Sequence, residues 1–221
     1  MSQASTSLPI VVAITGASGA VYATRLLQVL AAADRMVHLT ISPSGAAVIG
    51  QELGLRLDVR RPDLAALLGC VPSYITAKGH HRDAAAAAGR AESFIHYHAH
   101  DDYMTPIASG SFRTAAMVVC PCSGSTLSAI ARAAASNLIT RAAEVHLKEQ
   151  RKLILVPRET PMSVLQLENA HRIAAAGGVI LPAMPGWYHG VQTIADLVDF
   201  VVSRIVDQLD VDVELMRRWG N

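Results

Sequence analysis

IVVAI at Ile10–Ile14, followed by TGASGA at Thr15–Ala20, is the stretch from which the fold is inferred. Five apolar residues without polar alternation predict a strand buried on both faces, which is typical of a parallel sheet. The small residues after them predict a tight turn, and the apolar stripe along 21–33 predicts a helix after that turn. A strand, a turn and a helix in this order begin a strand–helix–strand unit.

The same alternation continues along the chain. Further strands are predicted at 38–41, 117–120, 153–156 and 179–181, and further helices at 126–135, 141–150, 164–176 and 194–209. We therefore predict a single doubly wound α/β domain over 1–221, flavodoxin- or Rossmann-like, with a mainly parallel sheet. Residues 1–8 are expected to be a flexible N-terminus. Residues 55–108 do not follow the alternation, and we expect one or two helices and an extended arm there.

Composition limits the function classes. Of 221 residues 51% are hydrophobic and 17% charged, with a net charge of +1, which excludes a disordered chain and gives no basic surface for nucleic acid. No apolar run approaches the roughly 20 residues of a membrane span, and the N-terminus is not a secretory signal. Three cysteines are typical of a reducing cytoplasm. The low charged fraction predicts that copies of the chain assemble and bury surface.

Three loops after predicted strands are rich in Gly, Ser and Thr and lead into helices. They are 15–20, 42–45 and 122–126. Small residues allow close approach, and a helix N-terminus offers N–H donors, so such loops hold phosphate well. A simple chain turn explains any one of them equally well, but three at one sheet edge favour a phosphorylated cofactor. Neither a G-x-G-x-x-G fingerprint nor a P-loop is present.

Several cations suggest a second phosphate site. Arg158 ends a buried strand together with Glu159, Arg141 and Lys148 lie two turns apart on one helix, and Arg204 interrupts an apolar run. A solvated helix face is the alternative explanation for Arg141 and Lys148. A structural ion pair is the alternative for Arg158 and Arg204.

These strings resemble, in order, the flavin prenyltransferase (UbiX-type) family over nearly the whole chain. They are TGASGA at 15–20, ASGSF at 108–112, CPCS at 120–123, RAAE at 141–144, LKE at 147–149, PRETP at 157–161 and PGWYH at 185–189, with Arg204 and Trp219 near the end. Pro43 and Ser44 depart from the pattern, since many relatives have Lys and Ala there.

The resemblance implies a cytoplasmic homododecamer that moves a dimethylallyl group from dimethylallyl phosphate to reduced FMN. The product, prenylated FMN, would serve a UbiD-type decarboxylase. FMN would be held by Ala17, Ser18, Gly19, Ser42, Ser123, Gly124, Ser125, Thr126 and Arg141. Dimethylallyl phosphate would be held by Lys148, Arg158, Tyr188, Arg204 and Trp219. Glu52, Glu159, Lys148 and Ser18 would take part in catalysis, without a metal.

This chemistry agrees with the residue types. Cations stabilise the charge that develops on a leaving phosphate, and Glu159 or the departing phosphate is a candidate base for the proton released on ring closure. Two other functions stay open. They are an FMN-dependent decarboxylase of the cysteine-decarboxylase group, and a flavin carrier without catalysis.

One cluster of histidines and one pair of cysteines could be interpreted as metal sites. His96, His98 and His100 alternate before Asp101 and Asp102, which on a strand would place three imidazoles on one face. We favour instead an exposed arm at a subunit contact, outside the sheet. The cysteines of Cys120-Pro121-Cys122 are expected to be buried sulfur at a strand end, since a zinc site needs two more ligands.

Overall fold

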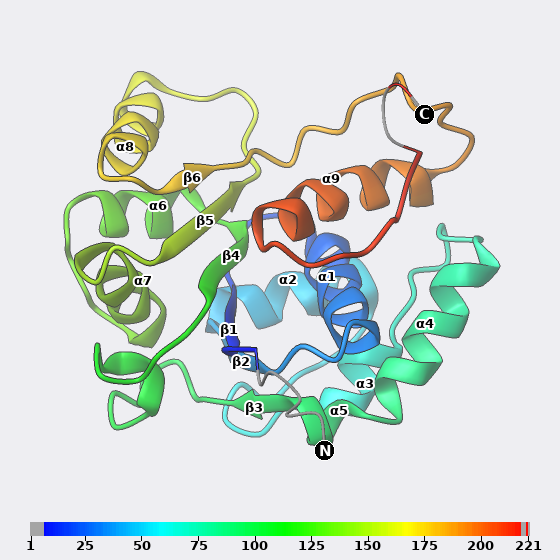
Figure 1. The fold of residues 1–221 in the computed structure, drawn as a ribbon, viewed down its shortest axis with the longest axis horizontal. Helices are drawn as coiled ribbons and strands as arrows, with labels where there is room; N and C mark the ends of the chain where they lie inside the picture. Colours follow the sequence, from blue (N-terminus) through cyan, green and yellow to red (C-terminus); the bar gives the residue numbers. More distant parts are fainter. Residues whose placement is uncertain (1–6, 218–219, 221) are drawn as a thin grey trace, which may run out of the picture.

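The computed structural model describes residues 7–217 and 220. Its centre is a parallel sheet with the strand order β3-β2-β1-β4-β5-β6 (Figure 1). The strands are β1 (Ile10–Ile14), β2 (Val37–Ile41), β3 (Ile95–Tyr97), β4 (Ala116–Cys122), β5 (Lys152–Pro157) and β6 (Val179–Ile180). The order reverses between β1 and β4, the position at which ligands bind in doubly wound folds.

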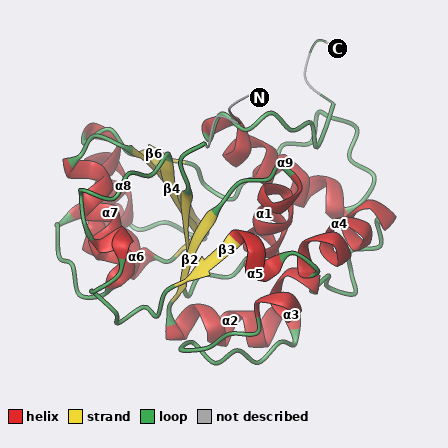
Figure 2. Ribbon diagram, turned by 60° about the horizontal axis from the view of Figure 1, so that its bottom comes forward, coloured by secondary structure: helices red, strands yellow, loops and turns green. Residues whose placement is uncertain are grey.

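Helices cover both faces of the sheet. They are α1 (Ala20–Ala32), α2 (Pro43–Leu53), α3 (Leu64–Gly69), α4 (Lys78–Ala88), α5 (Ala91–Phe94), α6 (Gly124–Ala131), α7 (Leu138–Lys148), α8 (Val164–Ala175) and α9 (Ile194–Gln208), with a 3₁₀ turn at Pro106–Ala108. One core contains α1, α9 and the α2–α5 segment, and the other contains α6, α7 and Ile173 of α8. Figure 2 shows the strands between these two groups.

Alternate residues of β1 enter the two cores, which explains its unbroken apolar sequence. Ile10, Val12 and Ile14 pack on the α1 side and Val11 and Ala13 on the α7 side, all without exposed surface. The predicted doubly wound fold is confirmed. Each of the five predicted strands and five predicted helices has a counterpart at nearly the predicted residues.

Part of the segment 94–102 lies in the sheet, so the prediction that this segment is an arm outside the sheet is wrong for residues 95–97. Ile95–Tyr97 forms the edge strand β3 and pairs with β2, placing His96 opposite His38. An edge strand of three residues with an exposed face has no continuous apolar run, which is why the sequence pattern does not indicate it. One or two helices were expected within 55–108, and the structure has three there, which are α3, α4 and α5.

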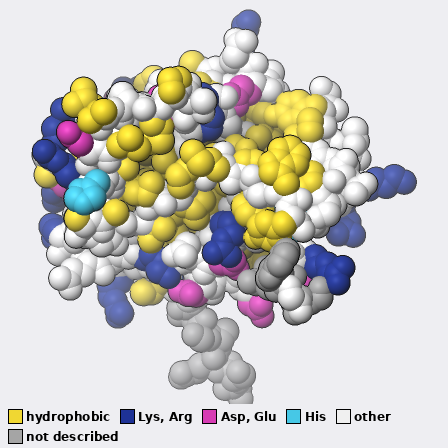
Figure 3. Space-filling view, turned by 90° about the horizontal axis from the view of Figure 1, so that it is seen from above, with side chains coloured by type: hydrophobic (Ala, Val, Ile, Leu, Met, Phe, Trp, Pro, Cys, Tyr) yellow, Lys and Arg dark blue, Asp and Glu magenta, His cyan; other side chains and the backbone are white. Residues whose placement is uncertain are grey.

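No helix in the described part of the chain is both long and apolar enough to cross a membrane. Large apolar side chains are nevertheless exposed on α8, on the loop after β6 and at the start of α9. They include Val164, Leu165 and Leu167 of α8, Met184 and Trp187 of the loop after β6, and Ile194 of α9. Figure 3, a view from above, shows hydrophobic side chains spread over one face of the molecule.

Candidate functional site

The three Gly/Ser/Thr loops meet at the carboxyl end of the sheet, as predicted. The Thr15 hydroxyl donates to the Pro121 carbonyl (2.8 Å) and accepts from the Ser123 N–H (2.8 Å), which joins the loops after β1 and β4. Gly16 lies against Ser44, where a Cβ would come within 2.6 Å of the Ser44 side chain. Glycine is therefore required there for the first loop to approach α2.

Serine hydroxyls begin both α2 and α6. Ser42 Oγ accepts from the Gly45 N–H (3.0 Å), and Ser123 Oγ accepts from the Thr126 N–H (3.3 Å). N-terminal N–H groups and adjacent hydroxyls, with the positive end of each helix dipole, form a polar surface suited to an anion.

The start of α1 is occupied by a carboxylate from the same chain. Glu52, on α2, accepts from the N–H groups of Gly19 (2.9 Å) and Ala20 (2.8 Å). Gly19 has a left-handed backbone with φ of 116°, which directs these N–H groups toward the carboxylate. A phosphate bound at this edge would therefore be expected at the serine-capped starts of α2 and α6, and not at the start of α1.

A cavity of about 500 Å³ adjoins Glu52. Its polar side contains Ser18, Glu52 and Arg158, and Arg158 Nε donates to the Ser18 carbonyl (3.3 Å). Its remaining lining is largely apolar and includes Val21, Ala183, Pro185, Ile194, Leu197 and Val198. A charged wall opposite an apolar wall suits a small ligand with an anionic head and a hydrocarbon tail.

Glu159 lies between this cavity and the start of α6. Gln166 Nε2 donates to Glu159 Oε2 (2.9 Å), and a Cβ on Gly124 would come within 3.7 Å of the same oxygen and 2.9 Å of Gln166 Nε2. The structure thus brings Ser18, Glu52, Arg158 and Glu159 to one end of the sheet.

Lys148 lies at the opposite end of the sheet. It ends α7, four residues before β5 begins, and pairs with the Glu149 carboxylate. Arg158 directly follows the last residue of β5, and a six-residue strand spans about 20 Å. Arg141, one turn into α7, donates from Nε to the Ala108 carbonyl (3.1 Å) and pairs with Glu144.

Arg204 and Tyr188 line neither the cavity nor the serine-rich loops. Arg204 pairs with Asp207 (2.7 Å), is half exposed, and borders a separate groove of about 270 Å³ between β6 and α9. Tyr188 packs edge to face on Phe200, with ring centroids 5.8 Å apart, and is 57% exposed. Trp219 lies outside the described residues.

Comparison with known proteins decides the family. The Flavoprotein family model matches residues 1–206. The chain is 45% identical over 211 residues to flavin prenyltransferase UbiX of Pseudomonas aeruginosa, covering 96% of this chain and 93% of that protein. The chain belongs to the flavin prenyltransferase family. The expected family, fold class and enzyme class are confirmed.

Two solved structures are similar along their whole length. AnUbiX (PadA1), in complex with FMN and dimethylallyl pyrophosphate, is 34% identical with a TM-score of 0.76, covering 97% of this chain and 98% of that one. A dodecameric FMN-dependent UbiX-like decarboxylase from Escherichia coli O157:H7 is 36% identical with a TM-score of 0.76, covering 97% and 100%.

Two tyrosines in the cavity beside Glu52 were missed by sequence reasoning. Tyr22 and Tyr74 both line it, and burial raises the pKa of each phenol, so both stay protonated at neutral pH. Tyr22 lies in the first turn of α1, directly after the first loop, and its place beside that loop could have indicated it. Tyr74 lies in the irregular segment, where no sequence signal points to it.

The side chains of the histidine and cysteine clusters make other contacts or are buried. No group of three or more His, Cys, Asp or Glu side chains among residues 7–217 and 220 is arranged to hold a metal ion. His98 instead contacts His38, with 2.8 Å between Nε2 and Nδ1. Cys120 and Cys122 are buried, as predicted, and burial raises the pKa of both thiols, that of Cys122 to about 12.

Proposed function

We propose that this chain transfers a dimethylallyl group from dimethylallyl phosphate to reduced FMN, and that a UbiD-type decarboxylase uses the prenylated FMN. The convergence of Ser18, Glu52 and Arg158 on a half-apolar cavity carries the proposal. A similar protein, AnUbiX, has been solved with FMN and dimethylallyl pyrophosphate. We also propose a cytoplasmic location, since Cys70, Cys120 and Cys122 are free thiols.

The serine-rich loops are proposed to hold FMN. The N–H groups and hydroxyls at the start of α2 and α6 suit its phosphate, and the glycines allow its ring to approach the backbone. The residues assigned to this role are Ala17, Ser18, Gly19, Ser42, Ser123, Gly124, Ser125, Thr126 and Arg141. Reduced FMN supplies the nucleophilic ring atoms that accept the prenyl group.

Arg158 is proposed to bind the phosphate of the donor in the cavity, with the prenyl tail against Leu197 and Val198. A fixed guanidinium stabilises the charge that grows on the leaving phosphate. Glu52, held by two N–H groups, presents negative charge toward the allylic carbon as that carbon becomes positive. Glu159 is proposed as the acceptor of the proton released on ring closure.

Lys148 is proposed to enter this site from another copy of the chain. Within one subunit, the length of β5 separates it from Arg158. The exposed apolar residues of α8 and the following loop provide a surface for assembly, and a dodecameric relative has been solved. We propose a homododecamer in which Lys148, Tyr188, Arg204 and Trp219 complete the donor site at subunit contacts.

The decisive experiment is an anaerobic incubation of the protein with reduced FMN and dimethylallyl phosphate, followed by mass spectrometry of the released flavin. The flavin should gain one prenyl unit. An unchanged mass would contradict prenyl transfer and favour a decarboxylase or a flavin carrier.

The same assay tests the assigned residues. Lys148→Ala and Glu159→Gln should lower the rate at least 100-fold while FMN still binds, because each removes one charged group near the reacting atoms. Lys78→Ala and Glu168→Gln, which change exposed residues of α4 and α8, are matched controls and should keep the wild-type rate. Full activity of both site variants would show that these assignments are wrong.

A further inference from the structure

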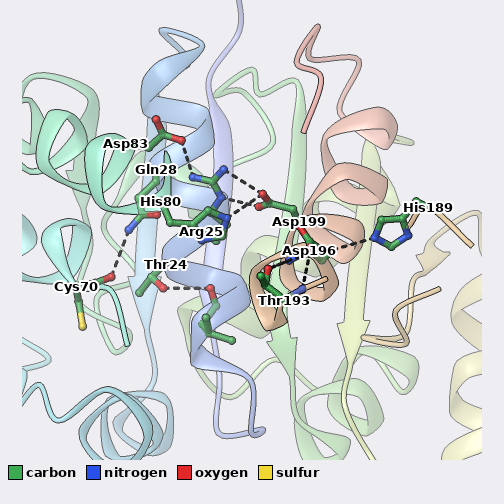
Figure 4. Close-up of polar contacts among 11 residues, drawn as sticks. Thr24, Arg25, Gln28, Cys70, His80, Asp83, His189, Thr193, Asp196 and Asp199 are labelled. Carbon is green, nitrogen blue, oxygen red and sulfur yellow. Dashed lines mark hydrogen bonds and ion pairs between the residues drawn. The ribbon is translucent and has the colours of Figure 1, made fainter. Parts of the chain in front are cut away.

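Four polar side chains from three helices meet behind the cavity, and we call them the latch: Arg25 of α1, His80 and Asp83 of α4, and Asp199 of α9. Asp199 accepts from Arg25 Nε (2.7 Å) and from His80 Nε2 (2.9 Å), while Arg25 Nη1 donates to Asp83 (2.8 Å). Figure 4 shows Arg25 between the two carboxylates. One carboxylate therefore joins α1, α4 and α9.

The latch is buried. The side chains of Arg25, His80 and Asp199 are 6%, 7% and 14% exposed. Burial acts to lower the pKa of Arg25, but the hydrogen bonds and charges of Asp199 and Asp83 outweigh it and hold that pKa above its usual value. Buried ion pairs contribute little net stability compared with apolar packing, whereas their bonds fix geometry. The latch is thus better explained by placement of the helices than by stability alone.

Each of the three helices joined by the latch either contributes residues to the cavity lining or directly follows a segment that does. Arg25 is one turn after Tyr22, and Asp199 directly follows Val198, and both of these neighbours line the cavity. Tyr74 lies four residues before α4, and His81 bonds the Ile75 carbonyl (3.0 Å), which attaches that segment to α4.

The exposed side of α9 carries further residues of the proposed donor site. Phe200, next to Asp199, packs on the Tyr188 ring and lies so close to Gly186 that a Cβ there would come within 2.8 Å of it. Arg204 follows one turn later. A rotation of α9 would therefore displace the cavity wall, the Tyr188 loop and Arg204 together.

We propose that Asp199 is a positioning residue for the prenyl donor, fixing the rotation of α9 against α1 and α4. This inference rests on the proposed function. Donor binding is sensitive to small displacements, because reacting groups must be held within a fraction of an ångström. The proposed FMN contacts lie in the loop before α1, at the starts of α2 and α6 and at Arg141, so none is on α4 or α9 and FMN binding should depend much less on Asp199 than donor binding does.

The test compares Asp199→Asn with the wild type in two kinds of measurement, which are the constants for the two ligands and hydrogen exchange. The KM for dimethylallyl phosphate should rise about tenfold, while the FMN dissociation constant changes less than twofold. Hydrogen exchange in 184–203 should accelerate without faster exchange in β1 and β4. Asp34→Asn is the matched control, because it alters an exposed pair with Arg90 at the far end of α1 and should change neither measurement.

The outcomes distinguish failure of the positioning role of Asp199 from failure of the proposed function. An unchanged donor KM, or equal losses for donor and FMN, would overturn the positioning role. Should Asp199→Asn fail to fold, His80→Ala, which leaves no side-chain donor, removes only one latch bond and should raise the donor KM about threefold. If the wild type transfers no prenyl group, the proposed function fails, and hydrogen exchange of the variants still decides whether Asp199 holds α9.

Discussion

At the scale of single residues, Glu52 holds the start of α1 from a different helix. An N-terminus of a helix leaves backbone N–H groups without partners, and here two of them bond one carboxylate. The negative charge also lies at the positive end of the helix dipole. Glu52 therefore supports the cavity wall as well as the proposed chemistry.

Replacing Glu52 by Ala should lower the free energy of unfolding by about 1–2 kcal/mol, because two donors lose their acceptor. Glu52→Gln keeps one oxygen that can accept and should cost less. Urea denaturation of the two variants, side by side with the wild type, measures the difference. Equal unfolding midpoints for all three would show that the bonds to Gly19 and Ala20 do not stabilise the helix.

Residue-level prediction worked where local chemistry has a sequence pattern. Ser42 and Ser123 follow strands and begin helices, so both positions were predictable from neighbouring residues. Tyr74 and Asp199 reach their partners only through tertiary packing, and no spacing in the sequence indicates those contacts. Lys148 and Arg158 were grouped as cations of one phosphate site, and again by family resemblance, although β5 separates them within one chain.

At the scale of elements, β3 attaches to the sheet partly through histidines. His38 of β2 is buried and stacks on His98, with centroids 5.0 Å apart, and lies 5.1 Å from the ring of His96. Burial and the two neighbouring imidazoles lower the pKa of His38 to about 4. Burial and His96 lower that of His98 as well, with Asp102 acting in the opposite direction.

These shifts predict a loss of stability in mild acid. The unfolded chain takes up a proton at His38 near pH 6.5, but the folded chain only near pH 4. The contribution of the neutral His38 imidazole to the free energy of unfolding is therefore complete above pH 6.5 and decreases as the pH falls toward 4. At pH 5 the free energy of unfolding should be lower by about 2 kcal/mol. Urea unfolding at pH 7.5 and pH 5 measures it.

His38→Gln should flatten this pH dependence, since it removes the buried titrating group. His171→Gln, which changes an exposed residue of α8, should keep the wild-type slope. A His38→Gln variant as acid-sensitive as the wild type would exclude His38 as the cause.

The sequence pattern predicts the strands at the centre of the sheet correctly, but it does not indicate the edge strand β3. β1, β4 and β5 are buried on both faces, so their apolar runs are continuous and easy to recognise. β3 has three residues with one exposed side chain, and the short helices α3 and α5 lack two full turns of pattern. Such segments acquire their structure from packing more than from local sequence.

At the scale of the whole molecule, the low fraction of charged residues goes together with large apolar side chains that are exposed on the surface of the single chain. Val164, Leu165 and Leu167 of α8 are all more than half exposed in the isolated chain. A surface of this kind is typical of subunits that bury it against copies.

If Lys148 and Arg158 act in one site from different copies, two inactive variants should complement each other. Lys148→Ala and Arg158→Ala, each inactive alone, should recover prenyl transfer when dissociated and reassembled as a mixture, because some sites then contain both wild-type residues. The flavin mass assay measures the recovery, and size-exclusion chromatography confirms reassembly. A reassembled mixture without activity would place both residues in the same subunit's site.

Both outer strands of the sheet are very short. β3 has three residues and β6 has two, so the sheet edges expose little backbone that another strand can pair with. Long free edges promote uncontrolled strand addition between molecules. In the proposed homododecamer, short edges would leave association to side-chain surfaces and would disfavour fibrous growth by strand addition.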